Sequence, residues 1–214
     1  MSRLNKGNHM KLHGLLAFAL LLASTVCAAK GPVGIGKLEI GMSRSAVEAL
    51  QGADGVHLVS PLTPYEYKYS SPVAGEDKFD TTVATPLSDE PLKAVLTFSA
   101  EKLQSIYIDL GDSSRIVDTA KDLISSKYGE PKTDNSMKEE QCVYKNGSNF
   151  KVSSGSIRYS WTQERPKAEP VKATVSDTVI DICPSNLRYA IGATKLKSLN
   201  IAVAKPEKPV TNPF

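Results

Sequence analysis

The apolar positions between residues 112 and 131 repeat at spacings of three and four, which is the period of an amphipathic helix. Five residues share the apolar face of this predicted helix: Ile116, Val117, Ala120, Leu123 and Ile124. Ser113 or Ser114 can cap its first N–H groups. Gly129 can adopt a left-handed conformation after the last turn, and Pro131 cannot continue the helix, so the pattern also predicts where the helix ends.

A shorter helix is predicted nearer the N-terminus. Leu38 and Ile40 alternate with charged neighbours and predict a short strand, and residues 42–50 then predict a helix with Ser43 as its N-cap. The apolar face of this helix is formed by Ala46, Val47 and Leu50. Residues 30–36 are rich in glycine and small side chains, so we expect them to be mobile and ordered structure to begin after them.

Three tyrosines alternate with charged residues in the segment that follows. Tyr65, Tyr67 and Tyr69 are separated by Glu66 and Lys68, which predicts a strand with three phenols on one face. This face has two interpretations. It can pack in or at the edge of a sheet, or it can form a surface for a protein partner, because tyrosine provides a large contact area at a small entropic cost.

Residues 71–91 combine prolines, glycine and scattered carboxylates, and we expect them to form a long polar loop. A loop of this length is uncommon in a compact domain unless it is functional or disordered, so it is a candidate binding element. Its carboxylates lack the spacing of a calcium-binding loop, and we predict no metal site there.

The strongest hairpin pattern joins residues 94–99 to residues 103–110. In its second strand three aliphatic residues point one way, while Tyr107 and Asp109 point the other. Four more β-type segments follow Pro131, and these are residues 140–145, 156–163, 174–183 and 186–191.

The order of these elements resembles a weak repeat. Residues 37–111 are predicted to form a first α/β unit, and residues 112–204 a second one. Each unit would lay one helix on one face of an antiparallel sheet and leave the other face available. We therefore expect an α+β fold of tandem units. The tail, residues 205–214, holds three prolines among lysines and is expected to be disordered.

The first 28 residues have the pattern of a secretory signal peptide, with a basic start, an apolar stretch and small residues at the end. The apolar stretch, residues 12–22, is shorter than the ~20 residues that span a bilayer as a helix, so cleavage is favoured over a retained anchor. Cys27 leaves a lipoprotein as an alternative, but the three residues before it do not match a lipidation signal. The expected location is the periplasm, with no transmembrane segment after cleavage.

Removing the leader changes the charge of the chain. The formal charge of +3 comes from 26 basic and 23 acidic residues, and the leader holds three basic residues and no acidic ones, so the mature chain is neutral. A neutral chain gives no support to a nucleic-acid partner. Cys142 and Cys183 then remain as an even pair, for which a disulfide is expected in an oxidising compartment. A metal pair or a catalytic thiol would need nearby histidines, and the second half of the chain holds none.

Two short motifs carry a resemblance to a known family. Residues 41–43, Gly-Met-Ser, with Val47, and residues 127–131, Lys-Tyr-Gly-Glu-Pro, resemble small secreted bacterial proteins with the β-lactamase-inhibitor-like fold. They are also similar to the small lipoprotein of the outer-membrane β-barrel assembly machinery. This resemblance implies tandem helix-plus-sheet units that bind another protein through an exposed sheet face, without catalytic residues.

The inventory of reactive residues argues against an enzyme. His57 is the one histidine of the mature chain, which excludes a zinc site of several imidazoles and a catalytic triad, and no phosphate-binding or dinucleotide motif predicts a cofactor. Paired carboxylates leave glycosidase-type chemistry open. The favoured function is a non-enzymatic periplasmic interaction module, inhibitor-like or an envelope-assembly accessory, whose partner is another periplasmic or envelope protein. The alternative is a binder of a small molecule or envelope lipid, with its ligand near Tyr159 and Trp161.

Overall fold

The structure is a computed structural model that describes residues 31–68, 71–184 and 192–204. Its two helices are α1 (Arg44–Glu48) and α2 (Ser114–Tyr128). Its strands are β1 (Gly34–Ile35), β2 (Leu38–Glu39), β3 (His57–Leu58), β4 (Thr63–Pro64), β5 (Asp77–Thr85), β6 (Ser88–Ser99), β7 (Lys102–Asp109), β8 (Lys132–Asn135), β9 (Lys138–Val143), β10 (Asn149–Arg165), β11 (Ala168–Ile180) and β12 (Thr194–Val203). The predicted signal peptide, the predicted tail and the segment 186–191 lie outside the described residues.

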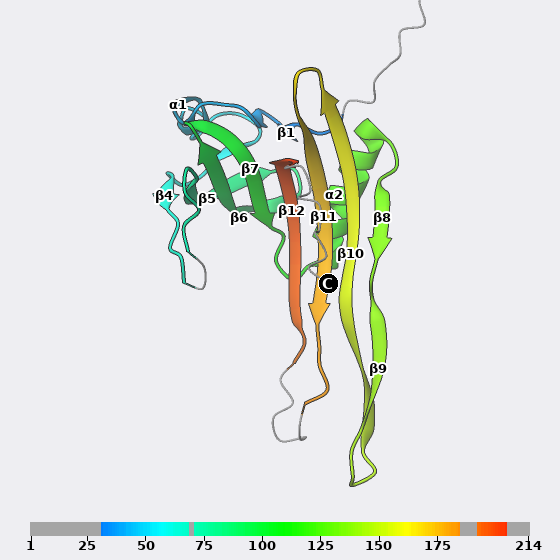
Figure 1. Cartoon of the computed structure of the whole chain (residues 1–214). Coiled ribbons are helices and arrows are strands. Elements are labelled where there is room, and N and C mark those ends of the chain that lie inside the picture. Colours follow the sequence, from blue (N-terminus) through cyan, green and yellow to red (C-terminus); the bar gives the residue numbers. More distant parts are fainter. Residues whose placement is uncertain (1–30, 69–70, 185–191, 205–214) are drawn as a thin grey trace, which may run out of the picture.

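Within the described residues, ten strands form one antiparallel sheet in the order β3-β5-β6-β7-β12-β11-β10-β8, with β4 beside β5 and β9 beside β10. The last strand in the chain, β12, lies between β7 and β11 and joins the two halves of the sheet (Figure 1). The α+β class and the antiparallel sheet are therefore confirmed. Two separate helix-on-sheet units are not confirmed, because the strands form one continuous sheet.

Helix α2 covers one face of this sheet, behind β10 and β11 in Figure 1. Its buried residues are Val117, Ala120 and Ile124, which belong to the predicted apolar face. Gly129 follows the helix with φ 84°, a value that a glycine adopts without strain. Ser113 holds the N-cap position, but its side chain makes no capping hydrogen bond. The helix and the residues at its two ends agree with the prediction, but the predicted capping hydrogen bond of Ser113 is absent.

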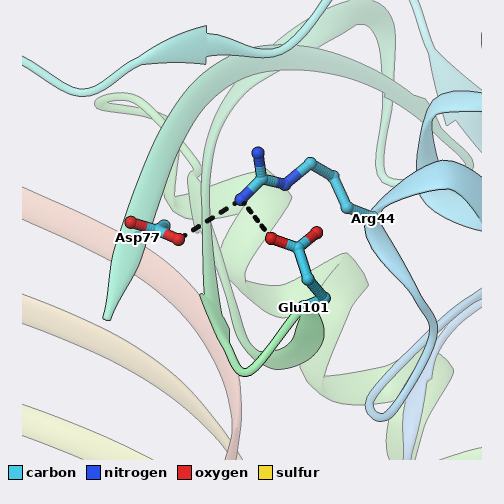
Figure 2. A network of polar contacts seen from close by, with 3 residues as sticks. All are labelled: Arg44, Asp77 and Glu101. Atoms are coloured by element: carbon cyan, nitrogen blue, oxygen red, sulfur yellow. Dashed lines mark hydrogen bonds and ion pairs between the residues drawn. The ribbon is translucent and has the colours of Figure 1, made fainter. Parts of the chain in front are cut away.

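Helix α1 is shorter than predicted. Ser43 caps it as expected, because its hydroxyl accepts a hydrogen bond from the Ala46 N–H at 3.2 Å, and Val47 is fully buried. Arg44 ties the helix to the sheet: its Nη2 lies 3.0 Å from a carboxylate oxygen of Glu101 and 3.3 Å from one of Asp77 (Figure 2).

The expectation of a mobile segment at residues 30–36 is wrong for residues 31–36, the part that the structure describes. Gly31 and Pro32 are buried, and Ile35 is buried in the core. A Cβ at Gly31 would lie 2.8 Å from the backbone nitrogen of Gln163, so the absence of a side chain lets this segment pass close to β10. Small residues here provide close backbone packing rather than mobility.

The long polar loop predicted at residues 71–91 is also wrong over most of its length. Residues 77–91 belong to the hairpin of β5 and β6, which turns at Pro86 and Leu87. The inward positions of β5 are Thr81, Val83 and Thr85, all buried. Threonine is β-branched and favours strands, so the segment is a strand although its composition is polar.

The predicted disulfide between Cys142 and Cys183 is present, with 5.5 Å between the Cα atoms. It joins β9 to the chain just after β11, in an arm where β9 and the first part of β10 extend beyond α2 (Figure 1). The Tyr144 hydroxyl donates a hydrogen bond to the Pro184 carbonyl at 2.9 Å, and the rings of Tyr144 and Phe150 stack. The disulfide and this contact hold the arm to the end of β11.

Candidate functional site: the open face of the sheet

The two faces of the sheet differ in what covers them. On β7, Ile106 and Ile108 are fully buried against the core, whereas Tyr107 and Asp109 point to the other side and are exposed. The core side contains α1, α2 and one cluster of apolar residues that spans both halves of the sheet. We call the other side the open face.

Strand register places one row of side chains straight across the open face. We call it the central row, and its members are Thr63, Asp80, Val95, Tyr107, Asn200, Thr174 and Ser160, from β4, β5, β6, β7, β12, β11 and β10. Most of these side chains carry hydroxyl, amide or carboxylate groups. Polar residues support one another here, since the Ser105 hydroxyl donates to Asn200 Oδ1 at 3.1 Å. The open face is therefore polar, with Tyr107 at its centre.

A cavity of about 570 Å³ opens on this face over β5, β6 and β7. Its lining includes Asp80 and Val95 of the central row, together with Lys93 and Asp109. Tyr107 also lines the cavity, on the side where β7 pairs with β12. Residues Ser60 and Pro61 close one side. The volume is in the range of small-ligand sites, which is about 300–1,000 Å³.

The environment of Tyr107 raises the pKa of its phenol. Burial raises the pKa of its phenol above the ordinary value, and the nearby carboxylate of Asp109 and the phenol of Tyr65 raise it further. The hydroxyl of Ser198 hydrogen-bonds the phenol oxygen and acts in the opposite direction. The phenol is thus neutral at pH 7 and can donate a hydrogen bond to a ligand.

The predicted tyrosine strand is only partly present. Strand β4 ends at Pro64, but the chain continues alongside β5, and the Tyr65 N–H donates to the Lys78 carbonyl at 3.0 Å. Tyr65 and Tyr67 are half-buried, and their rings meet edge to face at 5.1 Å. Tyr69 lies outside the described residues. The predicted alternation therefore places two phenols together, and Tyr65 lies near Tyr107 of the open face.

Two of the three charged side chains that line the cavity have no partner among the described residues. Asp80 is half-buried and Lys93 is exposed, and neither side chain forms an ion pair or hydrogen bond with any described residue. Asp109 differs, because its Oδ1 accepts a hydrogen bond from the Gly111 N–H at 2.9 Å. Both signs of charge are thus available in one cavity.

The other predicted ligand residues lie on the core side. Trp161 is 5% exposed, and its indole N–H donates to the Gly129 carbonyl at 2.8 Å, which secures the end of α2. Tyr159 packs against the core with the Lys121 ammonium 5.5 Å from its ring centroid. The structure does not bring these two residues to the cavity of the open face. A ligand role for them stays a prediction.

Reasoning from the sequence did not assign roles to Asp80, Lys93 or Tyr107. The alternation in β7 predicted that Tyr107 points away from the aliphatic residues, and this orientation is confirmed. The polar composition around Asp80 predicts a loop rather than a strand, and the sequence does not predict the pairing of β5 with β6 that places Lys93 on the same face.

No known protein family, characterised protein or solved structure matches this chain. The resemblance carried by residues 41–47 and 127–131 therefore stays a prediction. In the part of the chain that the structure describes, no group of three or more His, Cys, Asp or Glu could hold a metal ion. Nor does any helix there have the length and apolar character to cross a membrane.

Proposed function

We propose that this protein is a secreted, periplasmic, non-enzymatic interaction module that binds another envelope protein through the open face. The observation that carries this proposal is the asymmetry of the sheet: its core side is packed, whereas its open face presents Tyr107 and the neighbouring Tyr65 and Tyr67. Tyrosine is enriched at binding surfaces because its ring gives contact area while its hydroxyl hydrogen-bonds.

The size of the open face fits a transient complex. The central row crosses six gaps between strands, which at about 4.8 Å each gives a length of about 29 Å. With one flanking row on each side the width is about 15–20 Å, so the area is on the order of 500 Å². A standard complex buries about 800 Å² per partner, and smaller areas are typical of transient contacts.

The disulfide supports the proposed compartment. Bonds such as that between Cys142 and Cys183 form and persist in oxidising compartments and are rare in the cytosol. Together with the signal-peptide pattern of residues 1–28, it favours the periplasm. The tandem β-lactamase-inhibitor-like arrangement belongs to the same proposal. It is supported by the position of one helix before each half of the sheet, α1 before β5–β7 and α2 before β8–β11.

Cross-linked affinity capture from the cell envelope, followed by calorimetry with the purified partner, tests this function. The variant carrying Tyr65→Ser, Tyr67→Ser and Tyr107→Ser should weaken binding at least about 100-fold, since hot-spot truncations cost about 2 kcal/mol or more each. Val143→Ser is the matched control, because Val143 is 73% exposed on the arm, outside the open face. If the triple variant keeps its melting temperature and the full affinity, the open face is not the binding surface.

The cavity favours a second candidate, a binder of a small molecule or envelope lipid. Its volume of about 570 Å³ suits a ligand, and it lies over β5–β7 rather than beside Trp161. A titration with envelope extracts, followed by the NMR signals of Tyr107 and its neighbours, separates the candidates. Saturation with protein-free fractions would favour the ligand, and saturation with protein fractions alone would favour the interaction module.

A further inference from the structure

Of the two carboxylates in the cavity, Asp80 is the one without a hydrogen-bond partner among the described residues. Its carboxylate is half-buried beside Thr63 and Val95, yet no described residue donates a hydrogen bond to it or pairs with its charge. The hydroxyl of Thr63 donates to the Asp80 backbone carbonyl instead, at 3.2 Å. Removing a carboxylate from water without a partner is costly, so this position favours a ligand that supplies a positive charge.

Lys93 provides the opposite charge at a defined distance. Val95 is the register partner of Asp80, and Lys93 lies two residues before it on β6, so the two charged residues are diagonal neighbours on the same face. Diagonal positions of this kind are about 7–8 Å apart. No described ion pair joins Lys93 to Asp80 or Asp109. The Lys93 ammonium is therefore free to receive an anionic group.

The surface between these charges suits the uncharged body of a ligand. Val95 supplies an aliphatic contact, and Tyr107 beside it supplies a ring and a phenol that is a hydrogen-bond donor. Thr82, the register partner of Lys93, adds a hydroxyl group to the lining. The cavity thus combines the carboxylates of Asp80 and Asp109, the ammonium of Lys93 and a short amphipathic floor.

We propose that this cavity binds a small zwitterion, with the ligand's ammonium group on Asp80 and its carboxylate or phosphate on Lys93. The separation of the two side chains favours a dipeptide over a single amino acid, because each added residue moves the terminal charges apart by up to about 3.6 Å. Phosphoethanolamine joins an ammonium group to a phosphate over a shorter distance and tests whether a phosphate replaces the carboxylate. This inference rests on the second candidate function, the small-molecule binder, and names the ligand class of its cavity; it does not depend on a protein partner.

Calorimetric titration of the full mature protein tests the proposal with four probes: alanyl-alanine, phosphoethanolamine, N-acetyl-alanyl-alanine and alanyl-alanine amide. We expect at least one of the two zwitterions to saturate the protein, and whichever binds identifies the carboxylate or the phosphate as the anionic group. The acetylated peptide lacks the ammonium and the amide lacks the carboxylate. Each should bind about tenfold or more weakly than the intact dipeptide, the expected loss of one charge-assisted hydrogen bond. Flat titrations with both zwitterions, or a zwitterion bound no better than its capped forms, would overturn the proposal.

Substitutions locate the binding groups. Asp80→Asn and Lys93→Gln each remove one charge with little change in shape, and each should weaken binding of the zwitterion about tenfold or more. Asp134→Asn and Lys132→Gln are the matched controls, because both residues lie on the exposed strand β8, away from the cavity. Binding that survives both cavity substitutions unchanged refutes the site. These variants leave all three tyrosines in place, so a failure here and a failure of the protein-binding proposal can be told apart.

Discussion

Removal of the disulfide should cause a large loss of stability in this protein. The bond joins Cys142 to Cys183, which are 41 residues apart in the sequence. In the chain-entropy treatment, closing a loop of this length lowers the entropy of the unfolded chain by an amount worth about 4 kcal/mol at 25 °C. The double variant Cys142→Ala and Cys183→Ala should lose this amount, because alanine fills the buried position of Cys142, 2% exposed, without adding a polar group.

Urea unfolding provides the assay. The single Trp161 is buried on β10, inside the closed loop, so its fluorescence reports the loss of the sheet. With an m-value of about 2 kcal/mol/M, a loss of about 4 kcal/mol moves the midpoint by about 2 M. The reduced wild-type protein is the control and should unfold at the same urea concentration as the double variant. In the native protein, alkylation without reductant should add no mass.

The reasoning is refuted if the midpoint shift corresponds to less than about 1 kcal/mol while the m-value stays constant. That result would mean that the arm opens separately and that its disulfide does not constrain the unfolding that Trp161 reports. Two alkylated cysteines in the native protein would refute the bond itself.

Three further predictions test the packing of the sheet. The side chain of Lys197 is 3% exposed, and its ammonium pairs with the carboxylate of Asp177 at 2.5 Å. Lys197→Met should lower the free energy of unfolding in urea by about 3 kcal/mol, because it leaves this carboxylate without its partner. The double variant Lys197→Met with Asp177→Leu should recover most of the loss. Trp161→Phe removes the donor to the Gly129 carbonyl and should cost about 1 kcal/mol, with faster hydrogen exchange in the last turn of α2 and little change in the arm. Gly31→Ala places a Cβ against backbone atoms of β10 and should lower the free energy of unfolding by about 1–3 kcal/mol. An unchanged melting temperature would show that residues 31–36 do not pack against β10.

The elements that could be predicted from the sequence are those whose local pattern and tertiary environment agree. Helix α2 has a complete apolar stripe, and Gly129 and Pro131 define its end, so local reasoning was sufficient. The β6–β7 hairpin was found for the same reason, although its turn places Ala100 and Glu101 at positive φ, where glycine or asparagine is the usual choice. The disulfide followed from the count of cysteines and the expected oxidising compartment.

The elements that were missed depend on contacts distant in the sequence. Strand β5 buries Thr81 and Thr85 as inward positions, so its apolar alternation is weak, and only its pairing with β6 makes it a strand. In β12, Lys197 occupies an inward position and is neutralised by Asp177 across the strands, which breaks the apolar pattern of that strand. The cavity of the open face could not be predicted, because register alone brings Asp80, Lys93 and Tyr107 together.

The position of β12 makes the two halves of the sheet depend on each other. Its neighbours β7 and β11 both precede it in the chain, so until residues 194–203 have emerged, each half of the sheet presents an unpaired central edge. If the chain crosses a membrane in an extended form, as the proposed secretion requires, it can complete the sheet only after almost all of it has crossed. A cut between residues 111 and 112 would leave the N-terminal half without the strand that covers β7. We therefore expect unfolding to be a single cooperative event, and a truncation before Thr194 to expose two pairing edges at once and favour aggregation.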